Sequence, residues 1–319
     1  MPKYYSALFK EVVKRTLFHF GECNLKIEKE KSMPIQFYGQ PGKQAVLPKR
    51  PVRILFLTSI RDVVGDDRNG QLVSTPQGLN YLMGVVEYTI WQTRNKTVGN
   101  LYQVAEVAGI VTDDTKKDAH RYNISPLPGQ GRWIVPDSVD LGVPVFNIPS
   151  EFRLLPLIDK AHRRKAKQKF EAEVIELMAR LGIDVLISDH YMARLEFMFP
   201  PVLQFGRVLN IHPAPTVEDH MFCFKGKTPT ADAISMAKKN GLQVYTGATL
   251  HVVDPEIDHG PVVAFATDTP VFASDEPMWL RHRNYQQSKL PVFVAGLRHY
   301  ITRIYPYLNE LDLTKLVPV

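Results

Sequence analysis

Three side chains of this 319-residue chain, Asn210, His212 and Asp258, have types and spacing suited to stabilising an oxyanion. Asn210 and His212 lie in the run LNIHPAP, which is typical of a strand that ends at Pro213. Alternate side chains of a strand share a face, so the amide and the imidazole should point the same way. The amide can donate a hydrogen bond to a carbonyl oxygen that becomes an oxyanion, and the imidazole can donate or shuttle a proton. A polar strand end satisfied by loop backbone would use the same residue types, and these residues alone leave that alternative open.

Asp258 lies in a second motif, HVVDPEIDHGPVV, where glycine and proline indicate a tight turn. A carboxylate held beside an imidazole stabilises the protonated, donating form of that imidazole. An ordinary Asx turn is the structural alternative. A metal site built from His212, His251 and Asp258, with Cys223 as a remote fourth ligand, is a further alternative, but the spacing is not typical of zinc.

Strands and helices that alternate along the chain predict an α/β fold with a mainly parallel, twisted sheet and helices on both faces. In such sheets ligands bind beyond the carboxyl ends of the strands, where both Asp189-His190-Tyr191 and Asn210-Ile211-His212 are expected. Apolar, β-branched runs predict strands at 52–59, 102–114, 143–149, 184–188 and 207–213, and helical spacing predicts helices at 77–91, 157–181 (ended by Gly182) and 230–239.

The remaining segments complete the expected organisation. Runs at 248–254 and 261–271 are joined by too short a linker for a crossover helix, so we expect an antiparallel pair near the C-terminal part. The tail from Asp275 is expected to be helical and interrupted at Pro291. Residues 1–50 are expected to form an N-terminal extension, with a short amphipathic helix from Tyr5 to Thr16 and an irregular connector over 33–53. Residues 51–319 are expected to form the catalytic domain, including its C-terminal helices. Residues 115–142 are expected to form a long surface loop.

The composition narrows the class of partner only partly. A formal net charge of +6 suits anionic partners without naming them, and the basic cluster at 160–169 lacks interleaved aromatic residues. We interpret this cluster as a solvated helix face and expect neither nucleic acid nor membrane as a partner. Two cysteines, no apolar run of about 20 residues and no secretory leader favour a cytoplasmic protein.

Together the two motifs resemble the folate-dependent formyltransferase superfamily, which includes glycinamide ribonucleotide formyltransferase, methionyl-tRNA formyltransferase, sugar N-formyltransferases and 10-formyltetrahydrofolate hydrolase. The family's Asn-x-His-Pro strand end matches 210–213, and its Asp-Gly-Gly-Pro turn matches 258–261, with His259 at the first glycine position. The resemblance runs from about Val52 to the tail helix. It implies a Rossmann-like formyltransferase fold, 10-formyltetrahydrofolate as the formyl donor and a place in one-carbon metabolism. It also implies that the catalytic residues are Asn210, His212 and Asp258.

The resemblance further implies where the folate lies. The segment DVLISDHYMARL is similar to the family's strand and loop around the pterin, and the turn after His251 should close the other side. The folate-binding candidates are therefore Tyr191, Met192, Ala193 and Leu195 on the loop, with Val253, Asp254 and Pro255 on the turn.

Two departures from the family pattern concern the acceptor, a small-molecule amine. The phosphate-binding Gly-Ser-Asn loop of the glycinamide ribonucleotide enzymes is replaced by SIRDVVGDDRNG, whose Asp62, Asp66 and Asp67 suit a cationic or polyhydroxylated acceptor. The late-helix glutamate of those enzymes aligns with Gln286. We therefore expect a sugar nucleotide amine or an amino-acid-derived amine or hydroxylamine. A 10-formyltetrahydrofolate hydrolase and a non-catalytic folate-binding protein are the alternatives, and a homodimer is possible on this fold.

Overall fold

The protein is described from a computed structural model. The structure describes residues 35–39, 43–59, 71–74, 80–97, 99–115, 142–191, 193–199, 204–226, 228–240, 243–310 and 317–318. Several predictions lie outside these residues: the helix from Tyr5 to Thr16, most of the loop at 115–142, Met192, and the acidic residues Asp62, Asp66 and Asp67.

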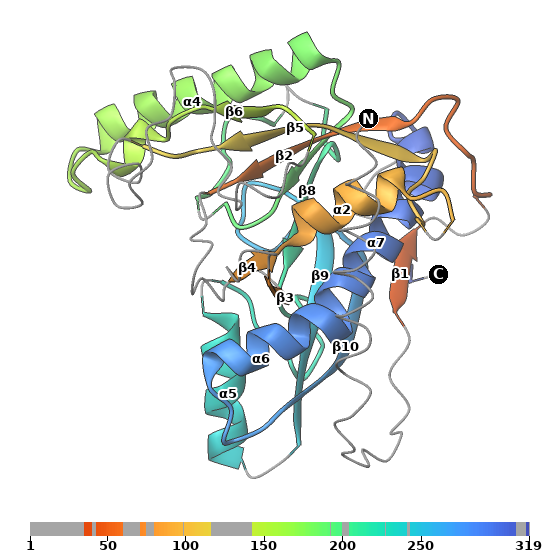
Figure 1. Cartoon of the computed structure of the whole chain (residues 1–319). Helices are drawn as coiled ribbons and strands as arrows, with labels where there is room; N and C mark the ends of the chain where they lie inside the picture. The colour runs from red at the N-terminus through yellow and green to blue at the C-terminus, as the bar shows by residue number, and fades with distance from the viewer. Residues whose placement is uncertain are drawn as a thin grey trace.

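A nine-stranded sheet forms the centre of the molecule, in the order β11-β1-β10-β9-β8-β7-β2-β5-β6 (Figure 1). Strands β6, β5, β2, β7 and β8 run parallel to one another. Strands β8, β9, β10, β1 and β11 pair antiparallel, each with the next in the sheet. The expected α/β class with an antiparallel pair near the C-terminal part is confirmed, and the antiparallel part also includes β1 and β11. The bounds are β1 (Gln36–Gly39), β2 (Val52–Thr58), β5 (Ala105–Thr112), β6 (Val145–Asn147), β7 (Val185–Ser188), β8 (Val208–His212), β9 (Val244–Val252), β10 (Val262–Val271) and β11 (Val317–Pro318).

Helices cover both faces of this sheet (Figure 1). Helix α4 (Lys160–Leu181) lies on one face, and α2 (Val85–Arg94) and α7 (Leu290–His299) lie on the other. Helices α5 (Pro229–Asn240) and α6 (Pro277–Asn284) pack near the far ends of β9 and β10, around a small third core. Helix α4 ends at Gly182, as predicted, because this residue takes the left-handed conformation (φ 60°) that closes the last turn.

The alternation of side chains along the central strands separates two cores. Leu186 and Val208 belong to the core beneath α4, whereas Ile187, Leu209 and Ile211 belong to the core beneath α2 and α7. Even-numbered residues at the ends of β7 and β8 therefore lie toward the α4 side, and odd-numbered residues toward the α7 side. This parity decides which polar side chains meet beyond the strand ends.

Two local predictions were wrong. The helix expected from residue 77 begins at Val85, and Asn80–Met83 instead forms β4, paired with β3 (Gln71–Ser74). The Glu87 carboxylate accepts a hydrogen bond from the Gly84 amide (2.8 Å) and so defines the first turn of α2. The expected irregular connector contains β1, which adds to the open edge of β10. A four-residue strand has too little periodicity to be recognised, and its partner is more than 200 residues away.

The tail is helical, as expected, and its irregularity lies just before Pro291. A π-helical turn, η2 (Tyr285–Lys289), separates α6 from α7, and Pro291 lies in the first turn of α7, where it has no N–H to donate. A π turn widens the helix locally and is frequent at functional sites. Lys289 is the last residue of this turn, and its side chain lines the cavity of the candidate site.

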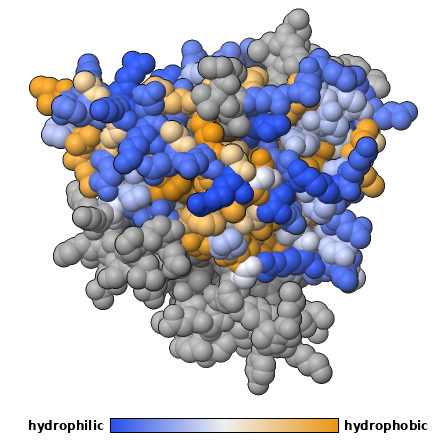
Figure 2. Space-filling view, turned by 90° about the horizontal axis from the view of Figure 1, so that it is seen from above, coloured by the Kyte–Doolittle hydropathy of each residue, from blue (hydrophilic) through white to orange (hydrophobic). Residues whose placement is uncertain are grey.

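The face seen from above is mostly hydrophilic, with apolar side chains between the charged ones (Figure 2). Helix α4 runs along this face in Figure 1, and Lys160, Arg164, Lys165 and Lys169 of its basic cluster are exposed. These side chains are solvated, as the sequence analysis expected. No helix in the described part of the chain is long and apolar enough to span a membrane.

Gly296 determines how closely α7 approaches the sheet. A β-carbon there would lie 2.9 Å from Ala264 Cβ and 2.9 Å from Leu250 Cδ2. We therefore expect Gly296→Ala to lower the free energy of unfolding by about 1–3 kcal/mol, in spite of alanine's higher helix propensity. Urea denaturation measures the change, with Ala295→Ser on the same helix as a control. An unchanged or raised midpoint for Gly296→Ala would contradict the tight packing.

Candidate active site

Strand β8 brings the predicted amide and imidazole to the carboxyl edge of the sheet. Asn210 is half-buried and His212 is 5% exposed. Asn210 is paired in register with Ser188 on β7 and with His251 on β9. Because β8 lies where the parallel and antiparallel parts meet, groups from both parts converge on this edge.

The turn between β9 and β10 places Asp258. Its start is held to β8 by a hydrogen bond from the Val253 amide to the Val208 carbonyl (2.8 Å). The Asp254 carboxylate accepts from the Glu256 amide (2.9 Å), which forms an Asx turn at this neighbouring aspartate and not at Asp258, where the sequence analysis named one as the alternative. Only glycine fits at 260, because a β-carbon would lie 1.8 Å from the Val252 carbonyl oxygen. Asp258 itself has the left-handed φ of 58°, so the turn presents its carboxylate inward.

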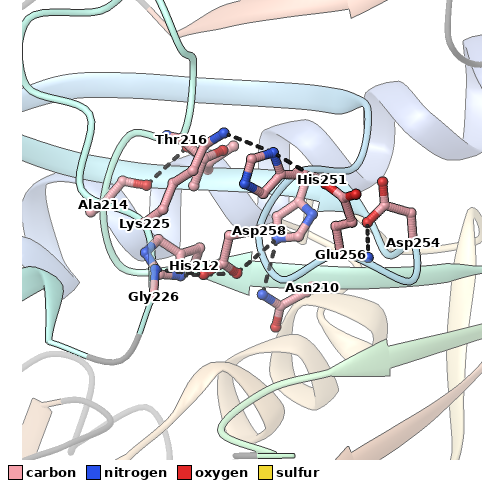
Figure 3. A network of polar contacts seen from close by, with 12 residues as sticks. Asn210, His212, Ala214, Thr216, Lys225, Gly226, His251, Asp254, Glu256 and Asp258 are labelled. Atoms are coloured by element: carbon pink, nitrogen blue, oxygen red, sulfur yellow. Dashed lines mark hydrogen bonds and ion pairs between the residues drawn. The ribbon is translucent and has the colours of Figure 1, made fainter. Parts of the chain in front are cut away.

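The Asp258 carboxylate is the centre of the polar network (Figure 3). Its Oδ1 lies 3.3 Å from His212 Nδ1 and 3.6 Å from His251 Nε2, and its Oδ2 accepts from the Gly226 amide at 2.9 Å. Burial alone would raise the pKa of this carboxyl. The hydrogen bond from His212, the nearby His251 ring, the charge of His212 and the Gly226 amide outweigh burial and hold the pKa well below its usual range. Asp258 is therefore ionised at neutral pH.

The two histidines have different hydrogen-bond partners. His212 faces an acceptor at each ring nitrogen, the Phe224 carbonyl at Nε2 (2.8 Å) and Asp258 at Nδ1, so the doubly protonated ring satisfies both. His251 donates from Nδ1 to the Val252 carbonyl (3.0 Å), and its Nε2 accepts from the Asn210 amide (3.1 Å). Asn210 keeps its second N–H for another acceptor. The cluster thus combines a buried carboxylate, an imidazole with an acceptor at each ring nitrogen, and an amide donor.

A cavity of about 300 Å³ opens over these residues. Asn210, His212, His251 and Asp258 all line it. Five of the predicted folate-binding residues also line it, namely Tyr191, Ala193, Leu195, Val253 and Asp254. Pro255 does not line it, but its carbonyl accepts a hydrogen bond from Arg194, which joins the predicted loop to the predicted turn.

The loop wall of this cavity is fixed from behind by α4. The Tyr191 ring stacks on Phe170 (centroids 5.7 Å apart, 8° between planes), and burial raises the pKa of its hydroxyl. The buried Glu171 carboxylate accepts from the backbone amides of Glu196 and Phe197. These contacts hold the segment around Leu195 in one conformation.

The structure also brings residues to the cavity that the sequence analysis did not select. Lys289 and Arg281 line it, as do His190 and Arg194. Gln286 lies on the same π turn as Lys289 but does not line the cavity. Lys289 pairs with Asp189, which lies 100 positions away in the sequence. No local sequence pattern predicts a contact between residues so far apart.

The metal alternative has no support in this geometry. No group of three or more histidine, cysteine, aspartate or glutamate side chains among the described residues is arranged to hold a metal ion. Cys223, the remote fourth candidate, does not line the cavity. Nitrogens of His212 and His251 are used in hydrogen bonds to backbone carbonyls.

The parallel half-sheet and the polar cavity at its carboxyl edge define an α/β protein whose ligand site lies at the strand ends. A model of the family described as "Formyl transferase" matches residues 99–294, more than half of the chain. The chain belongs to the formyl transferase family.

Curated relatives agree with this family, and a solved structure shares the fold. The chain is 28% identical over 160 residues to chloroplastic phosphoribosylglycinamide formyltransferase of Arabidopsis thaliana, covering 49% of this chain and 48% of the relative. It is 31% identical over 103 residues to a formyltetrahydrofolate deformylase of a Corynebacterium species, covering 32% of each chain. The matches thus span between about a third and a half of these relatives' lengths. Among solved structures, PvdF of pyoverdin biosynthesis, described as an N10-formyltetrahydrofolate-dependent formyltransferase, has the same fold with a TM-score of 0.63 at 24% identity. That match covers 78% of this chain and 99% of PvdF.

The lowered pKa of Asp258 predicts a pH-dependent contribution to stability. A carboxyl whose folded-state pKa is depressed stabilises the fold above its unfolded value, about 3.9, and loses that contribution as pH falls toward the folded value. We expect Asp258→Asn to lower the unfolding free energy at pH 7, and its deficit to shrink below about pH 4. Denaturation at pH 7, 5 and 3.5 measures this, with the exposed Asp219→Asn as control. A deficit that is the same at all three values would contradict the assignment.

Proposed function

We propose that the protein transfers a formyl group from 10-formyltetrahydrofolate to the amine of a small molecule. The observation that carries the proposal is the buried Asp258–His212 pair beside Asn210, at the mouth of a cavity in a formyl transferase family member. An amide donor beside a cationic imidazole matches the charge that develops when an amine adds to a formyl carbon.

The folate is proposed to lie between the 191–195 loop and the 253–258 turn. Tyr191 and Leu195 supply a buried apolar wall, and Val253 and Asp254 of the turn line the same cavity. The contact between Arg194 and the Pro255 carbonyl joins these two walls, so they enclose one slot. A flat, polar-edged ring such as a pterin suits a slot of this kind.

The reaction follows from the positions of the polar groups. The neutral acceptor nitrogen attacks the formyl carbon, and the carbonyl oxygen becomes the oxyanion of a tetrahedral intermediate. The second N–H of Asn210 donates to this oxygen, and His212 Nε2–H, held by the Phe224 carbonyl before the substrates bind, is redirected to it. Collapse breaks the bond to N10 of the folate, which takes a proton, and leaves a formamide and tetrahydrofolate. Holding both reactants in one cavity supplies much of the rate.

Asp258 is proposed to orient His212 and to balance its charge. Its strongly lowered pKa makes it a weak base while His212 is protonated. Once His212 has given up a proton, the attraction that lowered this pKa weakens, and Asp258 becomes able to relay a proton from the attacking amine. The two roles therefore follow one another in a single turnover.

Hydrolysis of the formyl donor is a second candidate function. The similarity to a formyltetrahydrofolate deformylase, 31% over 103 residues, favours it, because water in place of the amine would use the same three residues. Which acceptor is used depends on the part of the cavity away from Asn210. The acceptor roles of Asp62, Asp66, Asp67 and Gln286, the cytoplasmic location and the homodimer stay predictions.

The triad assignment predicts a large loss of rate with little loss of folate binding. We expect His212→Ala and Asp258→Asn each to reduce kcat by about a hundredfold or more, because each removes or misorients an oxyanion donor. Single-turnover formyl transfer and calorimetric titration with tetrahydrofolate measure the two effects. His162→Ala, an exposed histidine on α4, is the control. Rates within a few-fold of the unmodified protein would refute the assignment.

The choice between amine and water is decided by the dependence of formyl release on the acceptor. A transferase releases the formyl group of 10-formyltetrahydrofolate slowly without an amine and faster as an amine is added. One formamide is then formed for each tetrahydrofolate produced. A hydrolase releases formate at the same rate with or without amine. Measuring tetrahydrofolate, formate and formamide in one assay separates the two, and we expect the first pattern.

A further inference from the structure

A buried ion pair lies on the side of the cavity opposite the proposed folate walls. Lys289 Nζ is 3.0 Å from Asp189 Oδ1, and the two side chains are 8% and 2% exposed. Asp189 directly follows β7 and is anchored by a hydrogen bond from its amide to the Leu57 carbonyl (3.1 Å). Lys289 comes from the π turn between α6 and α7 and lines the same cavity as Asn210 and His212.

Strand parity separates this pair from the folate walls. Ser188, Asn210 and His212 extend toward the α4 side, where Tyr191 and Leu195 pack. Asp189 extends toward the α7 side and there meets Lys289. Arg281 on α6 and Pro229, Thr230 and Ala231 at the start of α5 line the cavity as well. The cavity therefore has two halves that meet at Asn210.

The charges of the two halves differ. The folate half contains Asp254 and Glu256 together with Arg194. The other half is lined by Lys289 and Arg281, and none of the described residues lining it carries a carboxylate. Asp189 lies behind Lys289 and is paired with its ammonium. Of the three N–H groups of the Lys289 ammonium, one is used by Asp189, and two are left for a ligand.

We propose that Lys289, held by Asp189, binds a carboxylate on the amine acceptor and thereby sets the acceptor specificity. This inference rests on the proposed formyl transfer and names the substrate class of that site, an amine that also carries a carboxylate. A doubly charged phosphate fits less well, because Asp189 touches the same ammonium and repels a second negative charge. Asp189 is a positioning residue, since it acts through Lys289.

Removing Lys289 alone would leave the Asp189 carboxylate buried without its partner and could unfold the chain. The informative variant therefore combines Lys289→Gln with Asp189→Asn, which removes both charges and keeps two polar side chains of similar size. Lys289→Arg keeps the charge and serves as the conservative rescue. The matched control removes another lysine–carboxylate pair, Lys43 with Glu310 (2.9 Å), which does not line the cavity.

The test compares kcat/KM for acceptors that differ only in the anionic group: 2,4-diaminobutyrate, ornithine and lysine against their carboxamides, and phosphoethanolamine against ethanolamine. We expect the protein to favour at least one carboxylate over its amide by about tenfold or more, as loss of a charge-assisted hydrogen bond implies. In the double variant the preference for the carboxylate over its amide should disappear, with the folate KM unchanged. Lys289→Arg and the control variant should retain the preference.

The outcomes separate the two proposals. If the protein binds tetrahydrofolate in calorimetry and releases the formyl group but shows no preference for a carboxylate, the role of Lys289 is overturned. The proposed formyl transfer is unaffected by that result. A preference for phosphoethanolamine over every carboxylate, or a ratio that survives in the double variant, also overturns the role of Lys289. Failure to bind the folate or to release its formyl group contradicts the proposed function itself.

Discussion

The buried Asp258 carboxylate is the constraint on which the rest of the site depends. A charge removed from water is tolerated only if donors replace its hydration, and here His212 and the Gly226 amide do so, with the His251 ring 3.6 Å away. These three neighbours come from different segments, so the carboxylate ties β8, β9 and the segment before α5 together. The lowered pKa of Asp258 and the position of the His212 ring between two acceptors are two consequences of the same arrangement.

That arrangement requires close backbone contacts that few residues allow. Gly260 lies directly against the Val252 carbonyl, and the Val253 amide binds the Val208 carbonyl, so the turn cannot shift without losing β8. Thr249 joins the chain beyond β8 to β9 by accepting from the Thr216 amide and donating to the Ala214 carbonyl. Backbone contacts therefore hold the turn and the segment after β8 in place.

The alternation of side chains at the ends of β7 and β8 explains why one cavity has two unlike walls. On the α4 side, Tyr191 and Leu195 form an apolar wall backed by Phe170 and the Glu171 carboxylate. On the α7 side, the π turn brings the Lys289 ammonium to Asp189. Asn210 lies between them, where a group could pass from a ligand on one wall to a ligand on the other.

Most of the fold was determined by the sequence itself. Runs such as VRILFLT and VLIS bury both faces and so predict parallel strands, and Gly182 marks the end of α4 because left-handed backbone favours glycine. The candidate residues Asn210, His212 and Asp258 were recognisable because each sits in a short motif whose local geometry follows from strand alternation and turn chemistry. Their catalytic roles stay predictions. Only the tertiary structure decided what depends on contacts between distant segments: the pairing of β1 with β10, the place of His251 beside Asp258, and the Lys289–Asp189 pair. The physical reason is range, because hydrophobic periodicity reports which face of an element is buried, whereas the partner of a buried charge is fixed only when the whole chain has packed.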